Sequence, residues 1–223
     1  MFEQNDFELV PSAPWEPLVR EPDAEPAALV NIVVAGTLLD VAKLVTTLLR
    51  VTYPDLGART DRITELVRFV ARRLELTQSW EFEVAARLSQ IGYLGLDPEL
   101  VAVGKRGEAL SEEHQRELAS HPLIARDLLA EVARLENVRE MIGRQSEPFT
   151  VPGCPMDPVA SRDRVDLGAH LLRACAAFDE LVWAGTDGGI AAGRLRSART
   201  EFCPEILDAL ATWAEGPGVS RAA

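Results

Sequence analysis

The three histidines are the side chains of this chain that are best suited to metal binding and to proton transfer near neutral pH. They are His114, His121 and His170, and they are scattered along the second half of the sequence. A hydrolytic metal centre needs several nitrogen, oxygen or sulfur ligands that converge on one point. The histidines alone therefore predict no multi-ligand metal centre.

The cysteines offer a second kind of reactive group. Cys154, Cys175 and Cys203 show no CxxC spacing. We expect idle or buried thiols in a reducing compartment and no disulfide framework. Nothing near Cys154 in the sequence lowers the pKa of its thiol, so we predict no cysteine catalysis.

Helical periodicity dominates residues 27–215, where apolar residues recur at i, i+3, i+4 and i+7. The clearest stretches are 37–52, 63–76 and 167–182, and no alternating strand pattern appears. Asp97, Ser111 and Asn137 are predicted to cap helix N-termini. The sequence thus predicts an all-α fold, a single bundle of about seven to nine helices.

The two ends of the chain differ from this helical domain. Residues 1–26 contain five prolines, seven acids and one base. This composition indicates an acidic, proline-rich N-terminal arm that is mostly irregular. Residues 216–223 follow the last periodic stretch and are expected to form a tail.

The overall charge of −12 and the hydropathy pattern exclude some partners. An acidic chain repels phosphate backbones, so nucleic acid is not an expected partner. The longest apolar run, residues 27–49, is interrupted by polar residues that include Asp40 and Lys43. The sequence therefore predicts no membrane segment. No basic, apolar leader opens the chain, so we expect a cytoplasmic protein.

Several segments, in order, resemble the bacterial HD-GYP family of the HD phosphohydrolase superfamily. Residues 88–96 (LSQIGYLGL) are similar to the family's LHDIGKIGI, and residues 171–181 (LLRACAAFDEL) are similar to its ILAVADAFDAL. The remaining matches are residues 59–63, 110–125, 135–147 and 202–206. The resemblance implies the helical bundle of an HD domain over most of the chain.

The departures from this family carry the functional prediction. In the family, histidines and aspartates at these places hold two or three metal ions. The resemblance implies a vestigial site in which only His121 keeps its family identity. The other positions are Arg59, Ser89, Gln90, Tyr93, Gln145, Ser146 and Ala176. An arginine at a ligand position repels a cation at short range, so we expect no metal, no cofactor and no catalysis.

Two parts of this site have alternative interpretations. His121 is either a lone ligand or base, or a helix-start histidine packed near the former site. Arg59 and Arg144 either line a pocket that binds an anion, or pair with acids while polar side chains fill a shrunken cavity. Buried polar groups without partners cost roughly 1–3 kcal/mol each. We therefore predict a polar network linking Arg59, Gln90, His121 and Gln145.

The sequence thus leads to three functional hypotheses. The first is a regulatory pseudoenzyme that recognises a protein partner in bacterial signalling. The resemblance implies cyclic di-GMP pathways, with GGDEF-type cyclases as one class of partner, and a homodimer is a further arrangement to test. The second is a sensor that binds a nucleotide or another anion in the vacated cavity. The third is a residual metal-dependent phosphodiesterase.

Overall fold

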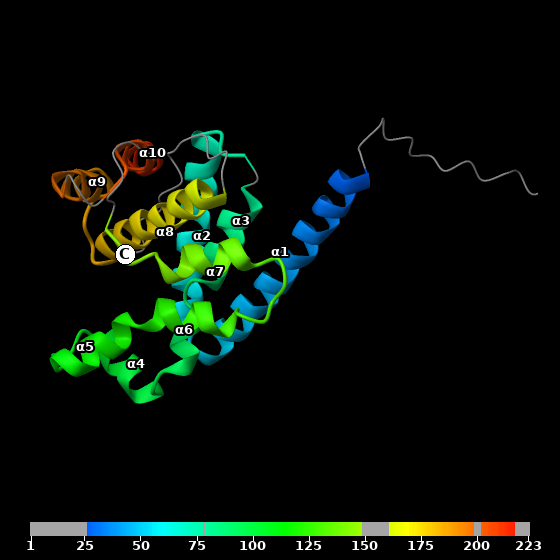
Figure 1. The fold of residues 1–223 in the computed structure, drawn as a ribbon. Helices are drawn as coiled ribbons and strands as arrows, with labels where there is room; N and C mark the ends of the chain where they lie inside the picture. The colour runs from blue at the N-terminus through cyan, green and yellow to red at the C-terminus, as the bar shows by residue number, and fades with distance from the viewer. Residues whose placement is uncertain (1–25, 78, 149–160, 199–201, 217–223) are drawn as a thin grey trace, which may run out of the picture.

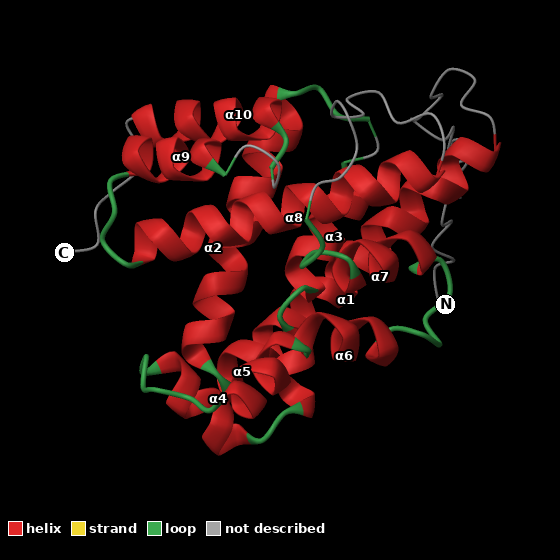
Figure 2. Ribbon diagram, turned by 60° about the vertical axis from the view of Figure 1, so that its left-hand side comes forward, coloured by secondary structure: helices red, strands yellow, loops and turns green. Residues whose placement is uncertain are grey.

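The structure, a computed structural model, describes residues 26–77, 79–148, 161–198 and 202–216. This part of the chain contains helices and connecting loops and no strand (Figure 2). The predicted all-α fold is confirmed. The helices are α1 (Pro26–Thr52), α2 (Pro54–Arg73), α3 (Trp80–Leu88), α4 (Pro98–Lys105), α5 (Glu112–Ala119), α6 (His121–Leu128), α7 (Glu136–Gly143), α8 (Ser161–Trp183), α9 (Gly188–Ser197) and α10 (Pro204–Glu215), with a 3₁₀ helix, η1 (Ile91–Gly95).

Local capping explains several helix starts. The Asp97 side chain accepts a hydrogen bond from the backbone N–H of Glu99 (2.7 Å), and Ser111 accepts one from that of His114 (3.2 Å). Both predicted caps are confirmed. The prediction for Asn137 is wrong, because α7 begins at Glu136 and the Asn137 amide instead donates to the Glu81 carboxylate (3.1 Å).

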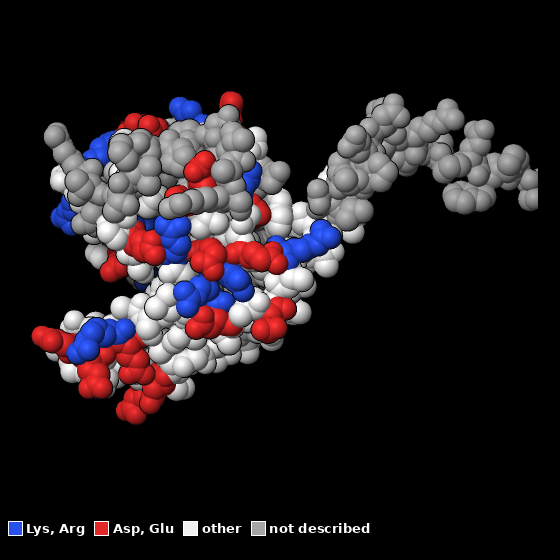
Figure 3. All heavy atoms as spheres, viewed as in Figure 1, with Lys and Arg blue, Asp and Glu red and all other residues white. Residues whose placement is uncertain are grey.

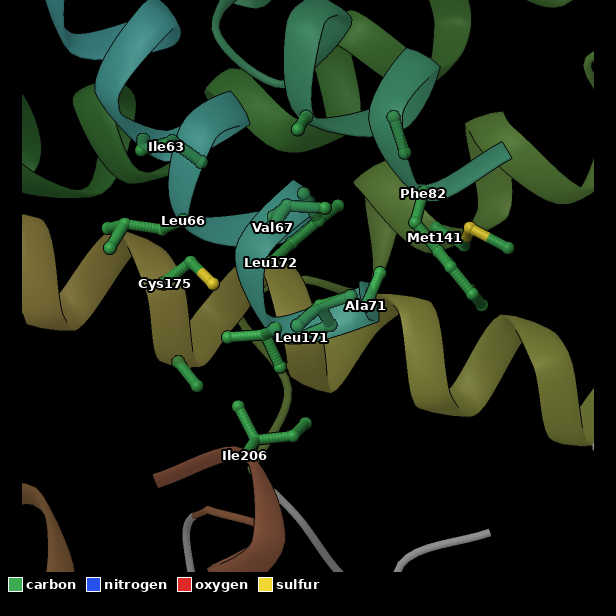
Figure 4. Packing of buried hydrophobic residues seen from close by; sticks show 14 of the residues in the cluster. Ile63, Leu66, Val67, Ala71, Phe82, Met141, Leu171, Leu172, Cys175 and Ile206 are labelled. Carbon is green, nitrogen blue, oxygen red and sulfur yellow. The ribbon is translucent and has the colours of Figure 1, made fainter. Parts of the chain in front are cut away.

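The core lies around α2 and α8, the two helices at the centre of the bundle (Figure 1). Helix α8 contacts α2, α3, α7, α9 and α10. Figure 4 shows side chains from α2, α3, α7, α8 and α10 meeting there, among them Leu66, Phe82, Met141, Leu171 and Ile206. The predicted stripes on 63–76 and 167–182 supply much of this core, which fixes the register of α2 against α8.

Helix α1 lies along one side of the bundle and projects beyond it (Figure 1). It begins at Pro26, well before the predicted start at residue 37. Proline suits the first turn of a helix, and a Cβ added at Gly36 would meet nothing within 4 Å.

Residues Ile32–Thr52 have a mean hydropathy of 1.9, and 17% of that window is buried. By length and composition alone this stretch is able to span a membrane, and the expectation of no membrane segment stays a prediction.

A second small cluster joins α1 and α2 to the η1–α4 region through Leu49, Leu56, Leu96 and Val101. The α4–α5 end carries many acidic side chains (Figure 3), and α5 has no buried residue. The predicted arm 1–26 and tail 216–223 fall almost wholly outside the described residues, apart from Pro26 and Gly216.

The cysteine prediction needs one correction. Cys203 is disulfide-bonded. Cys175 is a free, fully buried thiol on α8, and burial raises its pKa. The sequence prediction of idle thiols therefore holds for Cys175 and is wrong for Cys203, because a pairing between distant cysteines leaves no local spacing signal.

Candidate functional site

Arg59 on α2 faces two carboxylates on α8. Its Nη2 lies 3.5 Å from an oxygen of Glu180, and its Nε lies 3.8 Å from Asp179. Arg62, one turn further along α2, donates two hydrogen bonds to Asp179, at 2.6 and 3.1 Å. The Asp179 side chain is only 5% exposed. Two guanidinium groups therefore neutralise one buried carboxylate between α2 and α8.

Helical spacing brings these groups together. Arg59, Arg62 and Leu66 follow each other along one side of α2, and Leu66 is buried in the core beside α8. On α8, Asp179 comes four residues after the buried Cys175 and therefore lies on the same side of the helix. The guanidinium carbon of Arg62 also lies 4.1 Å from the centre of the Trp183 ring, a cation–π contact.

Tyr93 and His121 stack on each other next to this charged group. Their ring centres are 4.2 Å apart and the planes differ by 17°. Nδ1 of His121 lies 3.0 Å from the Leu118 carbonyl oxygen. The stack requires η1 to approach α6 closely, and Gly92 permits this, because a Cβ at that position would lie 1.8 Å from the His121 carbonyl oxygen.

The Tyr93 phenol lies close enough to the charges on α2 and α8 for them to change its pKa. Burial raises the pKa of the Tyr93 phenol, Arg59 partly opposes this shift, and Glu180 adds to it. The structure thus brings Arg59, Tyr93 and His121, three predicted site residues on three separate elements, to one region of the bundle.

Ser89 and Gln90 form a separate buried pair between α3 and η1. The Gln90 amide donates to the Ser89 hydroxyl (3.2 Å), which donates to the Ala86 carbonyl oxygen (2.9 Å). Arg59 is bonded to the acids of α8 instead. Among the described side chains, no direct hydrogen bond joins these two sets of contacts, and the single network predicted across Arg59, Gln90, His121 and Gln145 stays a prediction.

The end of α7 contacts α8 one turn before Ala176. Arg173 on α8 donates a hydrogen bond to the Ser146 carbonyl oxygen (2.6 Å), while the Ser146 side chain faces solvent. Gln145 is buried, and its amide nitrogen has no hydrogen-bond partner. Ala176 itself is half-buried and offers no polar group. Of the predicted site, this region therefore supplies one buried amide, that of Gln145, and no charged ligand from Ser146 or Ala176.

Arg144 lies away from Arg59. It is ion-paired with Asp166 and, at 2.9 Å, with Glu147. Asp166 and Asp179 are about 20 Å apart along α8, from the helical rise of 1.5 Å per residue. One small anion cannot contact both arginines. Of the two alternatives, the contacts favour pairing of Arg59 and Arg144 with acids over a shared anion pocket. Their side chains point to separate acids on one long helix.

The residues at this site do not fit the metal centre that the resemblance would imply. In the described part of the chain, no three His, Cys, Asp or Glu side chains form a group able to hold a metal ion. His121 is the one imidazole among the predicted site positions. The nearby carboxylates, Asp179 and Glu180, are already paired with arginines.

A cleft of about 420 Å³ lies along α2, away from these residues. Its lining includes Glu65, Arg68, Arg72 and Trp213, and none of the predicted site residues.

The sequence pattern did not identify Arg62, Asp179 or Trp183 as site residues. Asp179 belongs to the matched segment 171–181, but its partner Arg62 lies 117 residues away. No local spacing could therefore identify the pair.

A family model of the HD domain matches residues 43–198, well over half of the chain. The chain belongs to the HD domain family. The match extends from the second half of α1 to the end of α9 and includes every predicted site residue. Comparisons with curated proteins and with solved structures found no significant match. The HD domain is therefore shown at the level of the superfamily, and the closer resemblance to HD-GYP proteins stays a prediction.

Proposed function

We propose that this HD domain does not hydrolyse phosphodiesters and acts in signalling by binding a protein partner. The observation that carries the proposal is the ion pairing of Arg59 with Asp179 and Glu180. If the resemblance is right, this guanidinium stands where the family holds a metal ligand. It would repel a cation and also occupies the carboxylates that could bind one.

The chain's own residues have structural roles in this proposal. The pairs from Arg59 and Arg62 to Asp179 connect α2 to α8, and the Tyr93–His121 stack connects η1 to α6. Hydrolysis by this superfamily depends on metal-activated water, and these side chains provide no substitute for it. Such a site is best suited to hold the bundle rigid. The function that it supports best is therefore to present the surface of the bundle to a partner.

The partner class follows from the resemblance alone. HD-GYP-like sequences imply cyclic di-GMP signalling, so a GGDEF-type cyclase from the same organism is the first partner to test. Binding is measured by isothermal titration with the full chain. Saturable binding that survives Arg59→Ala supports a scaffold whose contact surface lies away from the site. Binding to no cyclase would remove this partner class from the proposal.

Metal content tests the proposal more broadly. The protein, purified without added metal or chelator, should contain far less than one Fe, Mn or Zn ion per chain by elemental analysis. One or more ions per chain, reduced by His121→Ala, would contradict it. Glu112→Ala on the exposed helix α5 is a matched control, because it removes a potential ligand away from the site.

A second candidate is a sensor that binds a nucleotide or another anion. The observation in its favour is that Arg59 Nε and Gln145 Nε2 are buried without a hydrogen-bond partner. Such groups cost free energy unless a ligand or water satisfies them. A thermal-shift screen with nucleotides separates the two candidates, because a sensor gains stability from its ligand and a scaffold does not. Arg59→Ala should abolish that gain in a sensor.

A further inference from the structure

Helix α1 carries an apolar face that nothing in the described chain covers. Val33, Val41, Leu44, Leu48 and Val51 are between 52 and 78% exposed. The opposite face of the same helix is buried against α2 and α3 through Ala42, Thr46 and Leu49. We call the five exposed residues the α1 seam.

The spacing within the α1 seam is that of a coiled coil. Val41, Leu44, Leu48 and Val51 follow one another in steps of three, four and three, so Val41 and Leu48, and Leu44 and Val51, are seven residues apart. Val33, eight residues before Val41, extends the apolar face but lies outside this register. This arrangement corresponds to the a and d positions of a heptad, where side chains insert between those of a second helix. A convex helix face of this kind fits another helix better than it fits an extended peptide.

The seam supplies more than half of the surface that a standard protein interface buries on each partner. From their exposed fractions, the five side chains present about 500 Å² of surface, against about 800 Å² buried per partner in a standard interface. Apolar patches of several hundred Å² on a protein surface mark interaction sites. Thr37 lies in line with the seam, between Val33 and Val41, and polar residues beside it, such as Lys43, would supply the rim of a contact surface.

We propose that the α1 seam is the interface between two copies of this chain. A two-fold dimer uses the same patch on both partners, and a wholly apolar heptad stripe is complementary to itself. The dimer would pair the α1 helices, which project from the bundle (Figure 1). The vestigial site lies between α2, α8, η1 and α6, so this inference does not depend on the proposed function.

Two other occupants are less well matched. Residues 1–25 contain Pro11, Pro14, Pro17 and Pro22, and prolines at this spacing prevent an uninterrupted helix that could match the seam. A membrane would have to accept the exposed Asp40–Lys43 ion pair. A spanning α1 would also have to give up the buried contacts of Thr46 and Leu49 in the bundle.

The mass of the full chain in solution tests the proposal. Sedimentation equilibrium of the wild type should give the mass of two chains. In the double variant Leu44→Glu/Leu48→Glu, the dissociation constant should rise by about 100-fold or more, because two carboxylates per chain would be buried without partners. Ile190→Glu on α9 is the matched control. Ile190 is 56% exposed, against 59% for Leu48, and its variant should remain dimeric.

Circular dichroism should show unchanged helicity in all variants. If the glutamate variant loses helicity, Leu44→Ser/Leu48→Ser replaces it and should also weaken the dimer. A wild type that is monomeric at every concentration overturns the proposal, as does a dimer that the seam variants leave intact. Flotation of the wild type with neutral phospholipid vesicles, lost in the seam variant, would assign the seam to a membrane surface and equally overturn it.

Discussion

Asp179 on α8 accepts two hydrogen bonds from Arg62 on α2, with donor–acceptor distances of 2.6 and 3.1 Å. The carboxylate is almost fully buried, and Arg59 approaches it from the same helix. This pair lies where the central helices α2 and α8 pack together and one turn beyond Ala176, which the resemblance places where the family carries a ligand aspartate.

Removing this carboxylate should destabilise the protein. Asp179→Ala leaves the partly buried Arg62 without its carboxylate and Arg59 with only the exposed Glu180, which costs about 2–4 kcal/mol after allowing for their partial exposure. Urea denaturation followed by circular dichroism measures the free energy of unfolding. The exposed Asp40–Lys43 pair provides the control, since Asp40→Ala should change this free energy by less than about 0.5 kcal/mol. Equal effects of both substitutions would contradict the role given to Asp179.

The approach of η1 to α6 should depend on Gly92. Gly92→Ala places a Cβ 1.8 Å from the His121 carbonyl oxygen, so η1 and α6 must separate at a cost of about 3 kcal/mol. Gly36→Ala meets nothing within 4 Å and lies inside α1. That variant should gain up to about 1 kcal/mol, since alanine favours helix more than glycine does. Thermal unfolding of the two variants should move in opposite directions, and a tolerated Gly92→Ala would show the contact to be loose.

Acid should weaken the fold partly through His170. Burial is the main cause that lowers the pKa of this imidazole, with Asp166 opposing the shift and Arg144 and Arg173 adding to it. A lowered pKa means that the unfolded chain binds the proton more readily than the folded chain. Stability should therefore fall as the pH drops through about 6.5, the ordinary value for histidine.

The stability difference between pH 7.5 and pH 5.5 isolates this effect. His170→Gln should reduce that difference, whereas His114→Gln on the exposed side of α5 should leave it as in the wild type. The same slope in the wild type and in His170→Gln would show that other groups cause the pH dependence.

The cysteine pairing can be counted directly. Without reductant, the protein unfolded in denaturant should expose one thiol, that of Cys175, to a thiol reagent. After reduction all three cysteines should react. Three reactive thiols before reduction would restore the sequence prediction of unpaired cysteines. They would also show that the Cys203 disulfide does not form in solution.

Local features of this fold could be predicted from the sequence, and long-range pairings could not. Asp97 and Ser111 signal helix starts through side chains that bond to N–H groups two or three residues away. The helical period of the 167–182 stripe identifies the buried side of α8. In contrast, the amide of Asn137 bonds to Glu81, 56 residues earlier, and nothing local distinguishes that use from a cap.

The candidate site was predictable in part for the same reason. Motif order placed Arg59, Tyr93 and His121 together, because the HD family fixes the order of its helices. The sequence could not reveal that Arg144 is ion-paired with Asp166, about 20 Å along α8 from Asp179. It also missed the α1 seam, since apolar residues at helical spacing predict a core face whether or not another element covers them.

Cyclic di-GMP hydrolysis tests the central claim most directly. The assay uses the full chain with Mn²⁺ or Fe²⁺ added, and it follows the linear and mononucleotide products by chromatography. The proposal predicts no turnover above the protein-free control, for the wild type and for His121→Ala alike, because the described part of the site has no ligand set to hold and activate a metal-bound water. Turnover that persists through repeated purification and disappears in His121→Ala would contradict the account and make this HD domain an active phosphodiesterase.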